Sequence, residues 1–451
     1  MIKKQIRKVF TYLDDVRNGD RRFHYLRTVE AELTLSRKEI ESHQWENLLR
    51  LLEDAYKHVP FYRARFAEAG LSPKAIRDPA DLEKLPILTK GDIRSNQESL
   101  LNSCFRADDL ITSATGGTTD SPITIYLDRD AWSRRRAAAL FFSRWFGYEI
   151  GERLALLWGA EQDFPKYKTW KSRLREWLVG PVLWLPSSYL NDEVMLRYYQ
   201  LLRDFSPGVL QAYPTPLYIF ACFLERKGLR LAIPNINVVA ECLYDYQRAK
   251  IEAVFNTKIF NWYGARELGH IGTECREHQG LHLNTYGLYA EVIPDAGRSG
   301  DGKGQLLFTD LSNRAMPLIR YQIGDIGMIS QRECACGRAL PFIEHVGGRY
   351  VETFKKKDGT YIPGVAFTNR IIQEHFGIEK LQIVQKDYGY YHLNIVKGKE
   401  YREEDLRGLK KRMCDFIHEP LAFEVNFVDD IMPEKSGKVL FCKSEVSANG
   451  L

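Results

Sequence analysis

The chain has 451 residues, of which 44% are hydrophobic, so it can bury a large core and is longer than most single compact domains. Lysine and arginine exceed aspartate and glutamate by only five, and the excess is scattered along the chain. Such a weak imbalance excludes a broad cationic surface for nucleic acid. We therefore expect at least two domains and no nucleic-acid partner.

The first residues, MIKKQIRKVF, are basic and predict an amphipathic helix, because apolar residues recur at helical spacing at Ile2, Ile6, Val9, Phe10 and Leu13. A solvated helix is the favoured interpretation, and contact with a membrane surface is the alternative. Acidic residues at 14 and 15 interrupt any apolar signal region, and nowhere do eighteen apolar residues run together. We expect a soluble cytoplasmic protein without a transmembrane segment.

The part of the chain up to residue 105 is predicted to be a helical scaffold. Apolar spacing runs through 28–59 and stops at Pro60, and the stretch 61–70 closes on Gly70. From about residue 107, short β-rich runs alternate with helical stretches. The β-rich runs are 124–127, 153–158, 237–242 and 258–264, and the helical stretches are 132–146, 216–228 and 246–255. This alternation predicts a layered α/β domain.

The composition changes after residue 348. Strand-like runs at 380–387, 390–398 and 423–430 surround a helical run at 403–417, a mixture typical of a small α+β module. The predicted fold class is α/β, with a large multilayer N-terminal domain of residues 1–348 and a small, mobile α+β C-terminal domain of residues 349–451. A cleft between two such domains is the natural place for an active site.

A loop of hydroxyl residues and glycines, SATGGTT at 113–119, is the first candidate for chemistry. Its backbone N–H and side-chain hydroxyl groups can converge on phosphate oxygens. It is not a Walker P-loop, because no Gly-Lys-Ser/Thr follows, and taken alone an ordinary hairpin or loop is the more frequent interpretation. The candidate nucleotide-binding residues here are Ser113, Thr115, Gly116, Gly117, Thr118 and Thr119.

Three further motifs follow in order: YGARE at 263–267, RYQIGD at 320–325 and SGK at 436–438. With the SATGGTT loop they resemble the ordered core motifs of the ANL superfamily of adenylate-forming enzymes. The phrases at 44–71, 82–93, 280–293, 315–327 and 334–338 resemble the phenylacetate-CoA ligase family. Within it, YGARELG and the N-terminal region are most similar to the CapK-like capsule-biosynthesis branch. The resemblance covers roughly residues 35–445.

The resemblance implies an ATP-dependent, AMP-forming ligase that activates a carboxylic acid as an acyl-adenylate and transfers the acyl group to coenzyme A. One alternative keeps the adenylation but uses an amine or a sugar as acceptor in polysaccharide biosynthesis. Another is a non-catalytic nucleotide-binding relative in envelope assembly. The implied cofactors are ATP or AMP, Mg²⁺ and coenzyme A. The acid itself is not readable from the sequence, and a homodimer is compatible with it.

Catalytic roles are expected for Lys438, Glu267 and Thr118. Pyrophosphate leaves as the substrate carboxylate attacks the α-phosphate, so catalysis consists mostly of positioning and charge stabilisation. Glu267 is a hard oxygen ligand suited to Mg²⁺ on the phosphates. Lys438 can bring a positive charge to the carboxylate and α-phosphate when the small domain closes. Taken singly, a solvated glutamate and a surface Ser-Gly-Lys turn are the plain alternatives.

The nucleoside is expected to contact a second group of residues. Asp325 has acceptor oxygens for both ribose hydroxyls, although a β-turn aspartate is the alternative. Arg349 would reach ribose or phosphate. Tyr263, followed by Gly264, would stack near adenine, and Glu241 lies where the resemblance implies an adenine-side loop. An acyl pocket is expected near Trp158, Tyr213, Trp262 and His270, although aromatic residues of this kind are often core residues.

A separate set of thiols and imidazoles suggests a metal. Cys275, His278 and His282 occur within ECREHQGLH, and Cys334 and Cys336 within ECACG. Three thiolates and one imidazole would form a closed tetrahedral Zn²⁺ site, which is structural because no position stays open for water. The residues leave both histidines open as the nitrogen ligand, and the resemblance favours His282. Four unrelated core residues are the alternative.

Overall fold

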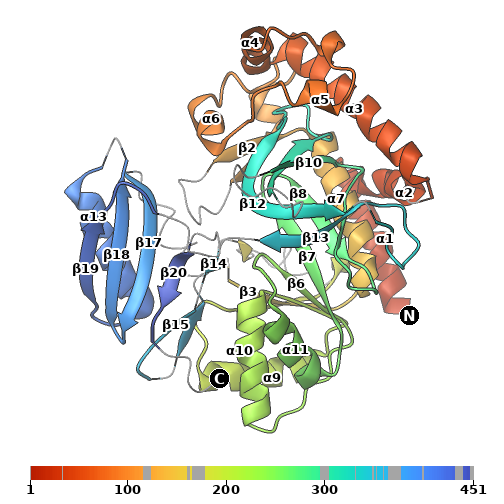
Figure 1. Cartoon of the computed structure of the whole chain (residues 1–451). Coiled ribbons are helices and arrows are strands. Elements are labelled where there is room, and N and C mark those ends of the chain that lie inside the picture. Colours follow the sequence, from red (N-terminus) through yellow and green to blue (C-terminus); the bar gives the residue numbers. More distant parts are fainter. Residues whose placement is uncertain are drawn as a thin grey trace. The chain divides into compact units, whose positions relative to one another are not determined.

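The computed structural model describes residues 2–32, 34–114, 123–159, 163–164, 178–294, 304–330, 332–347, 350–351, 353–358, 360–363, 377–398, 401–431 and 440–446 (Figure 1). The chain separates into two compact units. Unit 1 contains 1–115, 123–150 and 260–347, and unit 2 contains 116–122, 151–259 and 348–451. Residues 348–451 cluster with 151–259, so the predicted division into 1–348 and 349–451 stays a prediction.

The helices of unit 1 are α1 (Ile2–Arg17), α2 (Arg22–Glu32), α3 (Arg37–His58), α4 (Pro60–Glu68), α5 (Pro79–Leu82), α6 (Lys90–Ser95) and α7 (Arg129–Ser143). The predicted helix over 28–59 is interrupted between α2 and α3. Ser36 causes the break: its hydroxyl accepts from the Glu39 N–H at 3.4 Å, and the Glu39 carboxylate accepts from the Ser36 N–H at 2.7 Å. This capping box starts a new helix where apolar spacing alone suggested continuity.

The strands of unit 1 form a largely antiparallel sheet in the order β10-β11-β12-β13-β9-β8-β7, and β1 pairs with β2 in a separate hairpin. Their bounds are β1 (Ile111–Ala114), β2 (Thr124–Leu127), β7 (Ile259–Ala265), β8 (Gly269–Glu274), β9 (Leu281–Leu283), β10 (Leu288–Pro294), β11 (Gly304–Asp310), β12 (Tyr321–Ser330) and β13 (Phe342–Gly347). Leu48 and Leu52 of α3 share one core with Phe308 and Tyr321 of the sheet. The helical N-terminal part is therefore packed on the strands that carry the motifs.

Unit 2 contains a parallel sheet in the order β6-β5-β3-β4, accompanied by helices. The elements are β3 (Leu154–Trp158), β4 (Val182–Pro186), α9 (Asp192–Phe205), β5 (Val209–Ala212), α10 (Pro214–Arg226), β6 (Ile236–Val239) and α11 (Asp245–Phe255). Every residue of β6 is buried, as expected for a strand covered on both faces. This arrangement confirms the predicted α/β class.

The last part of the chain has its own small core around Leu393, Leu409 and Met413. Its sheet has the order β14-β20-β17-β18-β19, and β15 pairs with β16. The bounds are β14 (Tyr350–Val351), β15 (Thr353–Lys355), β16 (Tyr361–Pro363), β17 (Ile378–Asp387), β18 (Tyr390–Lys397), α13 (Glu403–Ile417), β19 (Ala422–Phe427) and β20 (Leu440–Ser444). The mixture is the predicted α+β composition.

Arg320 joins the helical N-terminal part to the sheet. It has φ of 51°, is 2% exposed, and its Nε lies 3.0 Å from the Glu291 carboxylate. Its Nη1 donates to the carbonyls of Glu83, at 2.7 Å, and Leu85. The Leu88 N–H donates in turn to the Arg320 carbonyl at 3.1 Å. The buried guanidinium of Arg320 therefore holds the segment just before α6 against β10 and β12.

We expect Arg320→Met to destabilise the fold by about 3–5 kcal/mol, because the Glu291 carboxylate, whose side chain is only 12% exposed, would be left unpaired. The free energy of unfolding, measured by urea titration, tests this. Arg332→Met is the matched control, since Arg332 pairs with Glu344 while its side chain is 58% exposed; it should change stability by less than about 1 kcal/mol. Equal effects of the two substitutions would contradict the structural role of Arg320.

Candidate active site

The YGARE turn connects β7 to β8 and carries a buried carboxylate. Glu267 is 5% exposed, and its Oε1 accepts a hydrogen bond from the Tyr321 hydroxyl at 3.0 Å. The Lys90 ammonium lies 3.7 Å from the same oxygen. At Gly264 a Cβ would lie 2.9 Å from the Gly269 carbonyl oxygen, so the paired strands β7 and β8 can approach this closely only because the residue is glycine. The turn therefore holds Glu267 in a fixed orientation.

Asp325 lies half-buried on β12, and its Oδ2 accepts a 2.7 Å hydrogen bond from the Tyr263 hydroxyl. Gly324, directly before it, has φ of 94°, a left-handed conformation that favours glycine. Tyr321, at the start of the same strand, is the partner of Glu267. Three predicted site residues, Tyr263, Glu267 and Asp325, are thus linked through β12.

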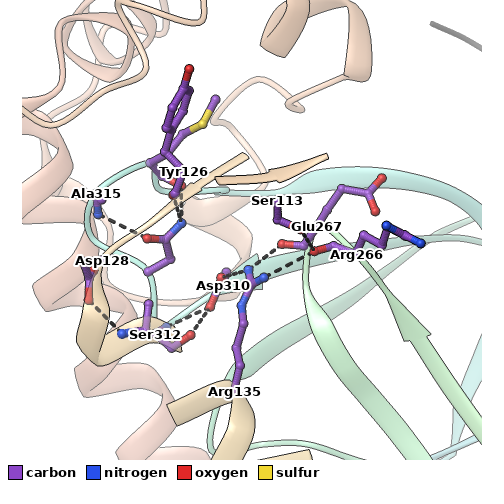
Figure 2. A network of polar contacts seen from close by, with 12 residues as sticks. Ser113, Tyr126, Asp128, Arg135, Arg266, Glu267, Asp310, Ser312 and Ala315 are labelled. Carbon is purple, nitrogen blue, oxygen red and sulfur yellow. Dashed lines mark hydrogen bonds and ion pairs between the residues drawn. The ribbon is translucent and has the colours of Figure 1, made fainter. Parts of the chain in front are cut away.

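Arg135 of α7 supports the turn from beneath (Figure 2). Its guanidinium donates to the backbone carbonyl of Glu267 and, at 3.4 Å, to that of Arg266. It also forms a 2.7 Å ion pair with Asp310, whose side chain is 1% exposed. The sequence predicted this helix, over 132–146, but assigned no role to Arg135 or Asp310. The available signal was a run of three arginines in an otherwise apolar helical stretch.

The strands that flank the SATGGTT loop are attached to the same network. The Ser113 hydroxyl at the end of β1 donates to the Arg266 carbonyl at 3.4 Å. On the other side, the Asn313 amide donates to the Tyr126 carbonyl of β2 at 2.9 Å. The end of β1 therefore lies at the turn that carries Glu267, and β2 is held by Asn313. Several predicted site residues lie outside the described residues, namely Thr115, Gly116, Gly117, Thr118, Thr119, Arg349 and Lys438.

Glu241 follows β6 in unit 2. Its Oε2 accepts a 2.9 Å hydrogen bond from the Thr215 backbone N–H in the first turn of α10, and Ala240 before it has φ of 70°. Desolvation by burial raises the pKa of Glu241 to about 7. A carboxyl that is partly protonated near neutral pH can donate as well as accept a hydrogen bond. The structure thus gives Glu241 a defined position, and its predicted adenine-side role stays a prediction.

The four residues of the expected acyl pocket form two aromatic pairs, one in each unit. In unit 2, the rings of Trp158 and Tyr213 are 5.0 Å apart. In unit 1, the His270 ring is 4.2 Å from that of Trp262 and 4.3 Å from that of Phe142. Burial lowers the pKa of His270 to about 3, so its imidazole is neutral near neutral pH. Contact of these residues with an acid stays a prediction.

The predicted metal ligands come together at one end of the unit 1 sheet. Single ligand atoms of Cys275, His282, Cys334 and Cys336 all lie within 4.8 Å of one another. The Cys275 and Cys334 sulfurs are 3.6 Å apart, and the Cys336 sulfur is 3.5 Å from His282 Nε2. His278 does not belong to this group, and its Nδ1 lies 3.0 Å from Glu274.

The chemistry of this group fits Zn²⁺. Bonds of about 2.3 Å to sulfur and about 2.0–2.1 Å to nitrogen place tetrahedral ligands roughly 3.5–3.8 Å apart, which matches the observed separations. His282 Nδ1 lies 3.3 Å from the Leu340 carbonyl, so a proton on Nδ1 leaves the Nε2 lone pair facing the thiols. Desolvation lowers the pKa of His282 to about 4, which keeps the imidazole neutral. Gly337 (φ 75°) closes the turn after Cys336.

Comparisons with known proteins agree with this architecture. Residues 354–445 match the CapK C-terminal domain family. A phenylacetate-coenzyme A ligase of Thermus thermophilus is 29% identical over 327 residues, which cover 68% of this chain and 69% of that protein. Protein CapK of Staphylococcus aureus is 26% identical over 418 residues, which cover 90% and 89% of the two chains.

A solved structure shares the fold across nearly the whole chain. It is 2-hydroxyisobutyryl-CoA ligase in complex with 2-HIB-AMP and CoA, with a TM-score of 0.63 and 18% identity over 92% of each chain. Such low identity establishes the fold and leaves the substrate open. The chain is therefore similar to the phenylacetate-coenzyme A ligases and to protein CapK, shares the fold of an acid-CoA ligase, and matches the CapK C-terminal domain family at residues 354–445.

Proposed function

We propose that the protein is an AMP-forming carboxylate ligase that uses ATP to make an acyl-adenylate and transfers the acyl group to coenzyme A. The observation that carries the proposal is the network around β12, where the Glu267 and Asp325 carboxylates are each oriented by a tyrosine hydroxyl. Tyrosine donors fix the acceptor oxygens before a nucleotide arrives, as positional catalysis requires.

Asp325 is assigned to the ribose. Tyr263 donates to Oδ2 of this carboxylate, and an aspartate carboxylate offers the acceptor atoms that ribose hydroxyls need. Glu267 is assigned to Mg²⁺, because it offers a carboxylate oxygen, the ligand that Mg²⁺ prefers, and because Tyr321 holds it in place. When bound there, Mg²⁺ would neutralise phosphate charge during departure of pyrophosphate.

The SATGGTT loop is assigned to the phosphates. The support is the attachment of β1 to the Glu267 turn through Ser113, together with the pairing of β1 with β2. We assign Lys438 to the attacking carboxylate and the α-phosphate, and Arg349 to ribose or phosphate, on the motifs and the resemblance. Thiol attack on the adenylate would then release AMP.

Fewer residues indicate the acyl acceptor than indicate the nucleotide. Lys355, Lys356 and Lys357 are candidates for contact with the phosphates of coenzyme A. Lys356 is 6% exposed and pairs with Glu419 at 3.0 Å, which favours a structural role for that lysine. Lys357 is exposed and stays the better candidate. Similarity to protein CapK supports the second candidate function, transfer to an amine or a sugar in capsule polysaccharide synthesis.

We further propose that Cys275, His282, Cys334 and Cys336 hold a structural Zn²⁺. All four positions of a tetrahedral site would be filled by protein, so the ion would have no place for water or substrate. Bound zinc would connect the end of β8 and β9 to the turn before β13, which runs on to Gly347.

Pyrophosphate release with ATP, Mg²⁺ and a panel of aryl, fatty and amino acids tests the proposed function. Hydroxylamine traps the adenylate whatever the natural acceptor is, and separate reactions with coenzyme A or amines identify that acceptor. We expect Glu267→Gln to slow hydroxamate formation by about 100-fold or more. Glu277→Gln, at an exposed position, is the control and should be unaffected. Nucleotide binding without pyrophosphate release from any acid would favour the non-catalytic relative instead.

A further inference from the structure

Helix α1 turns its polar side toward the protein and its apolar side outward. Thr11 and Asp15 are 4% and 3% exposed, whereas Ile6, Val9 and Leu13 are 49%, 58% and 54% exposed. A surface helix of a globular protein normally has the opposite orientation. The predicted amphipathic helix is therefore present, but its polar side is buried and its apolar side faces the solvent.

Ion pairs hold the polar side in place. The Asp15 carboxylate lies 2.7 Å from Arg22 and 3.5 Å from Arg136 of α7. Asp20, just beyond the end of α1, also pairs with Arg136. Because these charged partners lie on the inner side, rotation of α1 to bury its apolar side would leave Arg22 and Arg136 without the Asp15 carboxylate. The outward orientation of the apolar side is thus fixed by the protein.

The outward residues form one continuous apolar stripe, which consists of Ile6, Val9, Phe10, Leu13 and Val16. Their spacing of three and four residues places them on one face over the length of the helix. Exposed apolar residues scattered singly need no explanation, but a contiguous row marks an interaction surface. Figure 1 shows α1 with the N-terminus at its end.

The charge of α1 indicates what covers the stripe. Residues 2–13 contain Lys3, Lys4, Arg7 and Lys8 and no acidic residue. At 100° per residue, Arg7 lies about 60° beyond one margin of the stripe, and Lys8 lies about 80° beyond the other margin, on the side of Asp15. An exposed apolar face on a segment whose charges are all positive is complementary to the interface of a bilayer that contains anionic headgroups. Pairing two copies side by side would instead bring their cationic halves into the same interface.

We propose that α1 is a membrane-surface anchor: its apolar stripe inserts among the headgroups of an anionic bilayer, and the positive charge of residues 2–13 attracts the lipid phosphates. The helix lies in the plane of the interface and does not cross it, in keeping with the finding that no helix among the described residues is long and apolar enough to span a membrane. One helix of this kind gives reversible attachment.

Flotation of the full chain with lipid vesicles tests the anchor. Vesicles of phosphatidylcholine alone are compared with vesicles that contain about a third phosphatidylglycerol. We expect binding to the anionic vesicles, and a fall of about tenfold or more in the bound fraction for Ile6→Gln/Leu13→Gln. Lys3→Gln/Lys8→Gln should weaken binding and make it less sensitive to salt. Leu196→Gln, at a 44% exposed position on α9, is the matched control and should bind like the parent chain.

Three results would overturn the proposal. One is unchanged flotation of Ile6→Gln/Leu13→Gln, and another is equal binding of the parent chain to neutral vesicles. The third is a parent chain that is dimeric by sedimentation while Ile6→Gln/Leu13→Gln is monomeric, because a second copy would then cover the stripe. The rate of adenylation in solution should be the same for the parent chain and for Ile6→Gln/Leu13→Gln, since neither substituted residue lies at β12 or the YGARE turn.

Discussion

Lys438→Ala is expected to reduce acyl-adenylate formation by about 1000-fold or more while ATP binding persists. The reason is the charge that develops as the carboxylate attacks the α-phosphate: a positioned ammonium stabilises that charge in the transition state more than in the ground state. Hydroxamate formation with hydroxylamine measures the adenylation step alone, and calorimetric titration with an ATP analogue measures binding.

Lys411→Ala is the matched control for this lysine. Lys411 is exposed on α13 within the same CapK C-terminal domain, so its loss removes one charge from the domain without touching the SGK motif. Its adenylation rate should equal that of the parent chain. If Lys438→Ala turned over normally, the lysine would have no part in the mechanism, and the assignment of the SGK motif would fail with it.

Cys334→Ala is expected to abolish zinc binding and to destabilise the protein by at least about 3 kcal/mol. A structural Zn²⁺ ion binds the folded protein in preference to the unfolded protein, so the free energy of zinc binding adds to the stability of the fold. Metal content by mass spectrometry should fall from about one zinc per chain to near zero. The midpoint of thermal unfolding should fall with it, and a chelator should have the same effect on the parent chain.

Cys104→Ala controls for loss of a thiol, because Cys104 is exposed and does not belong to the metal-ligand group. It should keep its zinc and its stability. A parent chain purified without zinc, and stable in the presence of a chelator, would show that the four residues are ordinary core groups despite their geometry.

Much of the fold could be predicted, because the elements are strongly patterned. The helix over 132–146 and the buried strand around Val238 appear as α7 and β6. The break between α2 and α3 was missed, because apolar spacing continues across Ser36 and only its capping box with Glu39 interrupts the helix. A local polar signal there overrides the periodicity.

The candidate site was predictable where a motif carries it and not where tertiary contacts create it. The residues YGARE and RYQIGD identified Glu267 and Asp325, and the structure links both through β12. The support given by Arg135 and Asp310 was not predictable, because these residues are 175 positions apart and only the packing of α7 against the sheet makes them neighbours. The outward orientation of α1 was likewise hidden, since an amphipathic pattern does not say which side the protein will cover.

The buried guanidinium at position 320 also sets a rule for building chimeras. It binds backbone carbonyls at 83 and 85 on one side and a carboxylate at 291 on the other, so the segment around 79–95 cannot be exchanged on its own. In a hybrid joined after α6, the imported segment must present two backbone carbonyl groups to the guanidinium, as residues 83 and 85 do here. A crossover near residue 105 also separates this carbonyl turn from the guanidinium, so the same condition applies to it.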